Sequence, residues 1–126
     1  MPQTALRKIL IVDDDKQDVA LFRRLLERAG YSVTDYQSGK LGMRAIRETV
    51  FDLIILDLNI VDMDGFEVLQ TIRREMLKPR ILVVSGFMHG ELLNAARKLG
   101  AVAALDKLVA LDLLVPTVNG LFENVD

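Results

Sequence analysis

Four short apolar runs in this sequence each end beside a side chain that could do chemistry. The clearest run is LIIL at 53–56, which stops on Asp57. A run of this length, too short for a helix of its own, is typical of a fully buried strand in a parallel sheet. Open α/β sheets bind ligands beyond the carboxyl ends of such strands. The chemically capable residues that follow the four runs are Asp13, Asp14, Asp57, Ser85 and Lys107.

Asp57 taken alone supports two interpretations. Aspartate is common in turns, where its side chain bonds to the nearby backbone, so Asp57 could simply open the turn that we expect at 59–62. Alternatively, it could be a reactive carboxylate at the edge of a sheet. The arrangement of the other elements decides between the two.

Helices with an apolar period of 3.6 residues separate the predicted strands. Asp15, Ser38 and Asp64 are suited to cap the amino ends of three of them. We expect Met76 and Leu92 to face the core. The expected strands are 9–12, 31–36, 53–56, 81–84 and 102–105, and the expected helices are 16–29, 39–48, 65–76, 91–99 and 111–122.

The alternation of strands and helices predicts an α/β fold with a doubly wound parallel sheet of five strands and five helices. Right-handed crossovers leave few topologies, and the flavodoxin-like strand order 2-1-3-4-5 is the simplest. The strand at 31–36 has the weakest apolar pattern and is expected at an edge.

The last expected helix, 111–122, is apolar around most of its circumference. One face can pack on the sheet, which leaves the other for a partner. Pro116 lies inside it and removes a backbone hydrogen bond, so a kink is possible there.

Composition limits the classes of function. The 126 residues suit one domain, 1–126, with short flexible ends at 1–6 and 124–126. Sixteen basic and eighteen acidic residues give a net charge of -2, which offers no general attraction to nucleic acid or to a membrane surface. The absence of cysteine excludes disulfides and zinc–thiolate sites. No apolar run approaches ~18 residues and the start lacks a signal-peptide pattern, so a cytoplasmic location is expected.

In the predicted strand order, the polar residues at the strand ends share one edge of the sheet. Clustered carboxylates repel one another, and either proton uptake or a cation relieves the repulsion. An all-oxygen set favours a hard cation, Mg²⁺ or Mn²⁺. Such a site suits a phosphoryl group: Asp57 could attack phosphorus while the cation and Lys107 hold its oxygens and Ser85 donates a hydrogen bond.

The sequence resembles the response-regulator receiver domains, the CheY-like family, along essentially its whole length. The resemblance is carried by ILIVDDD at 9–15, LIILDLNIVDMDG at 53–65, VVSG at 83–86 and Lys107, in this order and at suitable spacing. It implies that Asp57 is the phosphoacceptor, which takes phosphate from a sensor histidine kinase or a phosphotransfer protein.

The resemblance also implies roles for the other residues. Ser85 matches the switch hydroxyl, and Lys107 matches the lysine that pairs with phosphate. Phosphorylation would alter the face made by the last two helices, through which a downstream protein or a second copy binds. Slow hydrolysis of the acyl phosphate would reset this signalling switch, which is not a metabolic enzyme. The implied Mg²⁺ ligands are Asp13, Asp14, Asp57 and the backbone carbonyl of Asn59.

Three departures from the family pattern concern how phosphorylation of the site would be transmitted to the output face. Val61 stands where proline is frequent, which suggests a less rigid loop after Asp57. Leu108 replaces the proline after Lys107; a cis bond before leucine would cost about 3 kcal/mol, so we expect a trans bond and a shifted lysine loop. Ala104 replaces an aromatic switch residue and leaves no ring to rotate.

Phe87, just past Ser85, is a candidate residue to cover the site and shield it from water.

Three alternatives remain at this stage. A phosphorylation-independent adaptor acting through its apolar last helix is favoured by Ala104 and Leu108 but opposed by the complete acidic site. A flavodoxin-like cofactor-binding protein would need a phosphate-cradling loop where the acidic run 13–15 stands. A hydrolase with an aspartate nucleophile would be helped by a second carboxylate where Asn59 stands. The sequence leaves open whether the chain stands alone or belongs to a hybrid kinase or a multidomain regulator.

Overall fold

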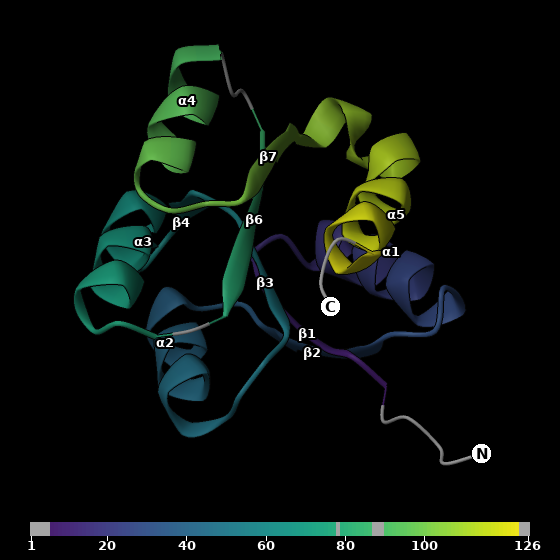
Figure 1. Ribbon diagram of the computed structural model, residues 1–126, viewed down its shortest axis with the longest axis horizontal. Coiled ribbons are helices and arrows are strands. Elements are labelled where there is room, and N and C mark those ends of the chain that lie inside the picture. Colours follow the sequence, from purple (N-terminus) through teal and green to yellow (C-terminus); the bar gives the residue numbers. More distant parts are fainter. Residues whose placement is uncertain (1–5, 78, 87–89, 124–126) are drawn as a thin grey trace.

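The computed structural model of the chain describes residues 6–77, 79–86 and 90–123 (Figure 1). Its centre is a five-stranded sheet with the order β2-β1-β3-β6-β7, in which every neighbouring pair is parallel. This is the predicted flavodoxin-like order, with the predicted weak strand at one edge. The strands are β1 (Lys8–Val12), β2 (Ser32–Tyr36), β3 (Leu53–Leu56), β6 (Arg80–Ser85) and β7 (Ala103–Asp106).

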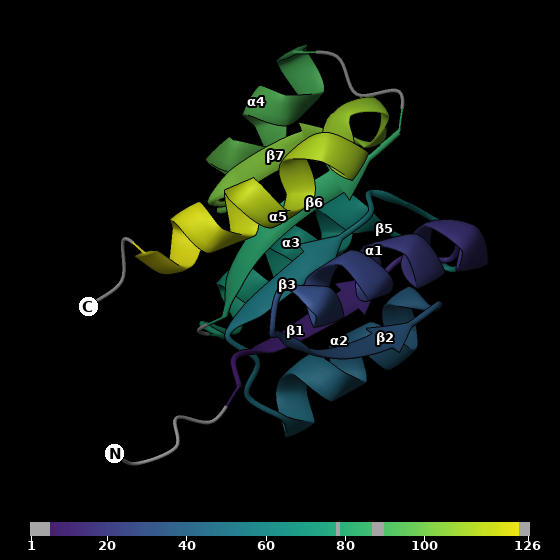
Figure 2. The ribbon, with the colours of Figure 1, turned by 90° about the vertical axis from the view of Figure 1, so that its right-hand side faces the viewer.

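Helices cover both faces of the sheet, as Figures 1 and 2 show. One face carries α1 and α5, and the other carries α2, α3 and α4. None of the helices in the described ranges is long and apolar enough to cross a membrane. The helices are α1 (Lys16–Arg28), α2 (Gly39–Glu48), α3 (Gly65–Arg74), α4 (Gly90–Lys98) and α5 (Lys107–Glu123).

The central strands are buried on both faces, which explains their unbroken apolar runs. In β1, Ile9 and Ile11 pack in the core beneath α1 and α5, whereas Leu10 and Val12 pack in the core beneath α2 and α3. Because Ile9–Val12 of β1 and all of β3 have no solvent-facing side, polar residues occur only at or just beyond the ends of these strands. The sheet therefore restricts chemistry to its edges.

The predicted amino caps of three helices are confirmed. Asp15, Ser38 and Asp64 each accept a hydrogen bond from a backbone amide of the helix that they precede. Each cap satisfies a helix amide that has no partner within its own helix. Asp64 starts α3 at the exit of the loop that follows Asp57.

Two predicted core positions are wrong. Met76 is 84% exposed, because α3 ends at Arg74 and Met76 lies beyond it with a φ of 55°. Leu92 is 40% exposed on α4, where Ala96 supplies the fully buried contact instead.

The last helix begins earlier than predicted. α5 starts at Lys107 rather than at residue 111, and Asp106 accepts a hydrogen bond from the Leu108 amide at 2.9 Å. Pro116 lies inside α5, which continues to Glu123. The early start matters because it puts Lys107 itself on the first turn of the helix.

The turn predicted at 59–62 is shorter than expected. Asn59–Ile60 (β4) pairs antiparallel with Met63–Asp64 (β5), so that only Val61 and Asp62 form the turn. This small hairpin stands between the end of β3 and the start of α3.

Gly65 permits the close return of this hairpin to the sheet. A Cβ atom at Gly65 would lie 2.3 Å from the Leu58 Cα, a backbone atom that cannot easily move. Gly120 in α5 is the opposite case, because a Cβ atom there would meet no atom outside its own helix within 4 Å.

We therefore expect the two glycines to respond oppositely to alanine. Gly65→Ala should lower the free energy of unfolding by about 1–3 kcal/mol through overpacking. Gly120→Ala should raise it by about 0.5–1 kcal/mol, because alanine favours the helix. Urea unfolding followed by circular dichroism measures both. A Gly65→Ala chain as stable as the wild type would contradict the close approach.

Candidate functional site

The structure brings together the side chains predicted for the carboxyl edge of the sheet. They come from the ends of β1, β3, β6 and β7, which lie side by side. Asp13, Asp57 and Ser85 are buried, at 2%, 4% and 0% exposure. Lys107 follows β7 directly and extends its ammonium group to the same place.

Asp57 is held through both of its carboxylate oxygens. Ser85 Oγ donates to Asp57 Oδ1 at 2.5 Å, and the Asn59 amide donates to the same oxygen at 3.0 Å. Lys107 Nζ donates to Oδ2 at 3.1 Å. Burial by itself would raise the pKa of Asp57, but the hydrogen bonds from Ser85 and Asn59 and the charge of Lys107 outweigh it and lower the pKa. Asp57 is therefore an ionised carboxylate at neutral pH.

Lys107 is surrounded by carboxylates. Its Nζ lies 2.9 Å from Asp13 Oδ2, 2.7 Å from Asp18 Oδ2 and 3.1 Å from Asp57 Oδ2. Burial alone would lower the pKa of Lys107, yet the bonds to Asp13 and Asp18 raise it overall. The lysine thus carries a permanent positive charge at the centre of the cluster.

One ammonium group does not balance the negative charge of the cluster. Asp13, Asp14 and Asp57 can each offer a carboxylate oxygen, and these three oxygens lie within 4.8 Å of one another. Burial, the largest cause, raises the pKa of Asp13 to about 6 even though Lys107 and the Asp15 amide act in the opposite direction. A set of oxygen donors with excess negative charge fits a hard divalent cation. The residues therefore fit Mg²⁺.

The loop after Asp57 is tied to the cluster and to a neighbouring helix. The Val61 amide donates to Asp14 Oδ2 at 2.9 Å, a bond that a proline at this position could not make. Asp62 accepts hydrogen bonds from Ser38 Oγ at 2.7 Å and from the Gly39 amide at 2.8 Å, at the start of α2. Val61 and Asp62 together connect the acidic cluster to α2.

The other departures from the family pattern have definite positions. The trans bond predicted after Lys107 is confirmed, but the shifted lysine loop is not found, because β7 ends at Asp106 and α5 begins at Lys107. Ala104 pairs with Val83 in the sheet and is only partly buried. Phe87 lies outside the described residues, as do 1–5 and 124–126 of the predicted flexible ends.

One predicted role is still untested, and one residue of the site was not predicted. Asn59 bonds to Asp57 through its backbone amide, whereas the metal-binding role of its carbonyl stays a prediction. Asp18, which bonds Lys107, was missed. Its signal is its place in the first turn of α1, three residues after the cap Asp15, at the helix end nearest the site.

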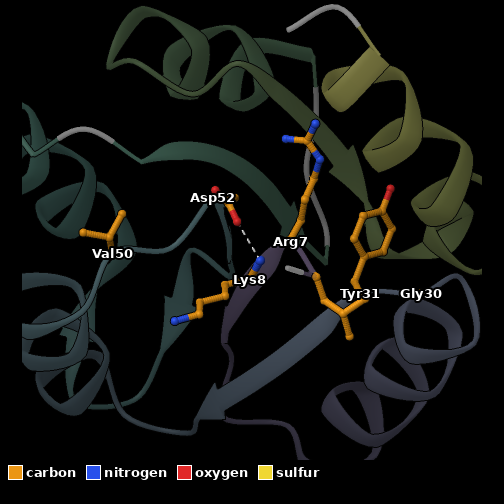
Figure 3. Close-up of a pocket in the computed structure, with 7 residues that line it drawn as sticks. Arg7, Lys8, Gly30, Tyr31, Val50 and Asp52 are labelled. Carbon is orange, nitrogen blue, oxygen red and sulfur yellow. Dashed lines mark hydrogen bonds between the residues drawn. The ribbon is translucent and has the colours of Figure 1, made fainter. Parts of the chain in front are cut away.

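A hollow of about 800 Å³ lies at the opposite end of the strands (Figure 3). At its floor, the Lys8 amide donates to Asp52 Oδ2 at 2.7 Å. Lys8 is the first residue of β1 and Asp52 directly precedes β3, whereas Asp13 and Asp57 follow these strands, so the hollow is separate from the candidate site. Its lining residues are Leu6, Arg7, Lys8, Gly30, Tyr31, Val50 and Asp52.

Comparison with known proteins agrees with the fold. A family model described as the response regulator receiver domain matches residues 9–119. The transcriptional regulatory protein ZraR of Escherichia coli K12 is 33% identical over 111 residues, which cover 88% of this chain and 25% of ZraR. The nisin biosynthesis regulatory protein NisR of Lactococcus lactis is 36% identical over 87 residues, which cover 69% of this chain and 38% of NisR.

Solved structures of response regulators have the same fold as this chain. The receiver domain of the Francisella response regulator 1452 has a TM-score of 0.89 at 25% identity and covers 95% of this chain and 99% of that one. The chemotaxis response regulator CheY4 of Vibrio cholerae has a TM-score of 0.84 at 26% identity, covering 92% of this chain and 98% of that one.

A doubly wound parallel sheet with an acidic cluster, a hydroxyl and a lysine at its carboxyl edge defines a class of signalling domain. The chain belongs to the response-regulator receiver domain family of two-component systems. It spans about a quarter of the length of ZraR.

The contacts of Asp62 generate a prediction about pH. Its bond from Ser38 is the main cause that lowers the pKa of Asp62 from 3.8 to about 2. A carboxyl whose pKa is lower in the folded state stabilises the fold above its unfolded pKa, and this is lost as the pH falls through its folded pKa. Asp62→Asn should therefore be less stable than the wild type at pH 6, and the difference should disappear near pH 2.

Thermal unfolding across this pH range measures the effect. Asp112→Asn is a matched control, because Asp112 is exposed on α5 and no hydrogen bond of its side chain occurs among the described residues. A stability difference between Asp62→Asn and the wild type that does not change with pH would show that the charge of Asp62 is not what ties the hairpin to α2.

Proposed function

We propose that this receiver domain, residues 1–126, is a phosphorylation-activated switch whose phosphoacceptor is Asp57. The donor would be the phosphohistidine of a sensor histidine kinase or of a phosphotransfer protein. The observation that carries the proposal is the environment of Asp57: an ionised carboxylate at a strand end, bonded by Ser85 on one oxygen and by Lys107 on the other.

In the proposed reaction, a carboxylate oxygen of Asp57 attacks phosphorus and forms a P–O bond. The P–N bond of the phosphohistidine breaks, and the electron pair returns to the imidazole, which takes up a proton. Lys107 and Ser85 are placed to bond the phosphoryl oxygens that arrive at the carboxylate, because both already contact its oxygens. Positioning and charge stabilisation would account for the catalysis.

A divalent cation, Mg²⁺ with Mn²⁺ as a possible substitute, would be held by Asp13, Asp14, Asp57 and the Asn59 carbonyl. When bound, it would neutralise negative charge on the phosphoryl oxygens. The oxygen-only donors and the unbalanced charge of the cluster support this assignment.

Hydrolysis of the acyl phosphate would return the switch to its resting state. The chain would therefore catalyse only its own phosphorylation and dephosphorylation, and we do not propose a metabolic substrate. A cytoplasmic location is part of this proposal, because ATP-dependent histidine kinases phosphorylate their receiver domains there.

The proposed output surface is the face of α4, β7 and α5. Leu108 is 90% exposed and Leu111 is 56% exposed on α5, and Leu92 is 40% exposed on α4. Apolar side chains at these exposures favour a protein partner, either a downstream target or a second copy of the chain. The net charge of -2 gives no reason to propose direct binding to nucleic acid.

Phosphorylation of the purified chain tests the proposal. Incubation with Mg²⁺ and acetyl phosphate should add one phosphoryl group, detected by intact mass spectrometry at neutral pH, and Asp57→Asn should add none. Asp112→Asn is the control and should behave as the wild type. A wild-type chain that binds Mg²⁺ but stays unmodified would contradict the proposed function.

The phosphorylation-independent adaptor remains the second candidate, because Leu108 is highly exposed and Ala104 supplies no rotating ring. Hydrogen–deuterium exchange of the wild type with and without acetyl phosphate, alongside Asp57→Asn, separates the two. A switch should change the exchange of α4, β7 and α5 only when Asp57 is present and phosphorylated. An adaptor should show the same exchange in all three samples.

A further inference from the structure

Asp18 is a charged side chain in the site that the proposed reaction does not use. It lies in the first turn of α1, and its carboxylate makes the shortest of the three ion pairs of Lys107, at 2.7 Å against 2.9 Å and 3.1 Å. The Asp18 side chain is 32% exposed, whereas those of Asp13 and Asp57 are 3% and 5% exposed. Asp18 therefore approaches the ammonium group from the solvent side.

Three carboxylates surround the Lys107 ammonium group. An ammonium group has three N–H donors and no acceptor; here Nζ donates to Asp18 and to Asp57, and Asp13 Oδ2 lies 2.9 Å away as a third ion-pair partner. A phosphoryl group on Asp57 adds further anionic oxygens. Lys107 can bond one of them only by weakening or leaving a bond that it already has.

Asp18 and Asp13 constrain Lys107 differently. Asp13 belongs to the acidic cluster, and a hydrogen bond from the Asp15 amide at 2.9 Å holds its carboxylate beside Asp57. Asp18 comes from a separate element, α1, and lies outside the cluster of candidate cation ligands. The attraction of the Asp18 carboxylate for the Lys107 ammonium group thus competes with the attraction of the Asp57 carboxylate for the same group.

We propose that Asp18 is a positioning residue that holds the Lys107 ammonium partly away from Asp57 and thereby restrains phosphorylation of the domain. The inference rests on the proposed function and deepens it, because it names the side chain that sets how readily the site accepts a phosphoryl group. Asp18 acts through Lys107 and does not touch the reacting atoms.

Removal of the Asp18 charge should have two opposite effects. At saturating Mg²⁺, Asp18→Asn should accelerate phosphorylation by acetyl phosphate about three- to tenfold, because Lys107 is then free to pair with the phosphoryl oxygens. The affinity for Mg²⁺ should fall by a similar factor, because the released ammonium is shared by Asp13 and Asp57 alone and neutralises them more fully.

A double-mutant cycle with Lys107→Gln separates positioning from a general effect of charge. If Asp18 acts through Lys107, Asp18→Asn should change the Mg²⁺ affinity of the Lys107→Gln chain less than twofold. Asp18→Glu, which keeps the charge, should restore Mg²⁺ affinity and phosphorylation rate to near the wild-type values. Isothermal titration with MgCl₂ measures affinity without any reaction, and urea unfolding checks that each variant is folded.

The outcomes are distinct. Faster phosphorylation and weaker Mg²⁺ binding in Asp18→Asn, both lost in the Lys107→Gln background, support the inference. Equal effects of Asp18→Asn in both backgrounds, or a folded Asp18→Asn chain that behaves as the wild type, overturn it. A wild-type chain that accepts no phosphate overturns the proposed function instead, whatever the Mg²⁺ titrations give.

Discussion

The site depends on an imbalance of charge around one ammonium group. Asp13, Asp18 and Asp57 come from the end of β1, the first turn of α1 and the end of β3, and all three bond to Lys107. Asp14 adds a further carboxylate that Lys107 does not bond. Buried negative charge of this kind is costly unless it is compensated. The same excess that weakens the resting fold is what makes the site suited to a cation and, with the cation, to a phosphoryl group.

The fold can hold this arrangement because most of the site stands on rigid elements. The central strands are packed on both faces, so the backbone just beyond β1, β3 and β6 has little freedom. The hairpin after Asp57 is fixed at Asp14 through Val61 and at α2 through Asp62, and Gly65 lets it return close to Leu58. Any change at the acidic cluster therefore has a direct physical connection to α2 as well as to α5.

Much of the fold and of the site was predictable from the sequence, for identifiable reasons. Buried parallel strands appear in the sequence as unbroken apolar runs, and helix caps appear as Asp or Ser at the helix starts. These signals were enough to predict the strand order and the residues that meet at the carboxyl edge of the sheet. The contact between Asp18 and Lys107 did not follow, because it joins residues far apart in the sequence whose pairing depends on side-chain reach. The early start of α5 was missed because an apolar helix has no one-sided stripe to mark its first turn. Met76 was predicted in the core because the apolar period of the sequence continues past Arg74, where the helix ends.

The most direct test of the account is to locate the phosphoryl group. Reduction of the phosphorylated chain with borohydride converts an aspartyl phosphate into homoserine, and peptide mass spectrometry then identifies the modified position. The account predicts homoserine at position 57 and at no other position. Homoserine at position 13, 14 or 18, or a stable phosphate on Ser85, would contradict it.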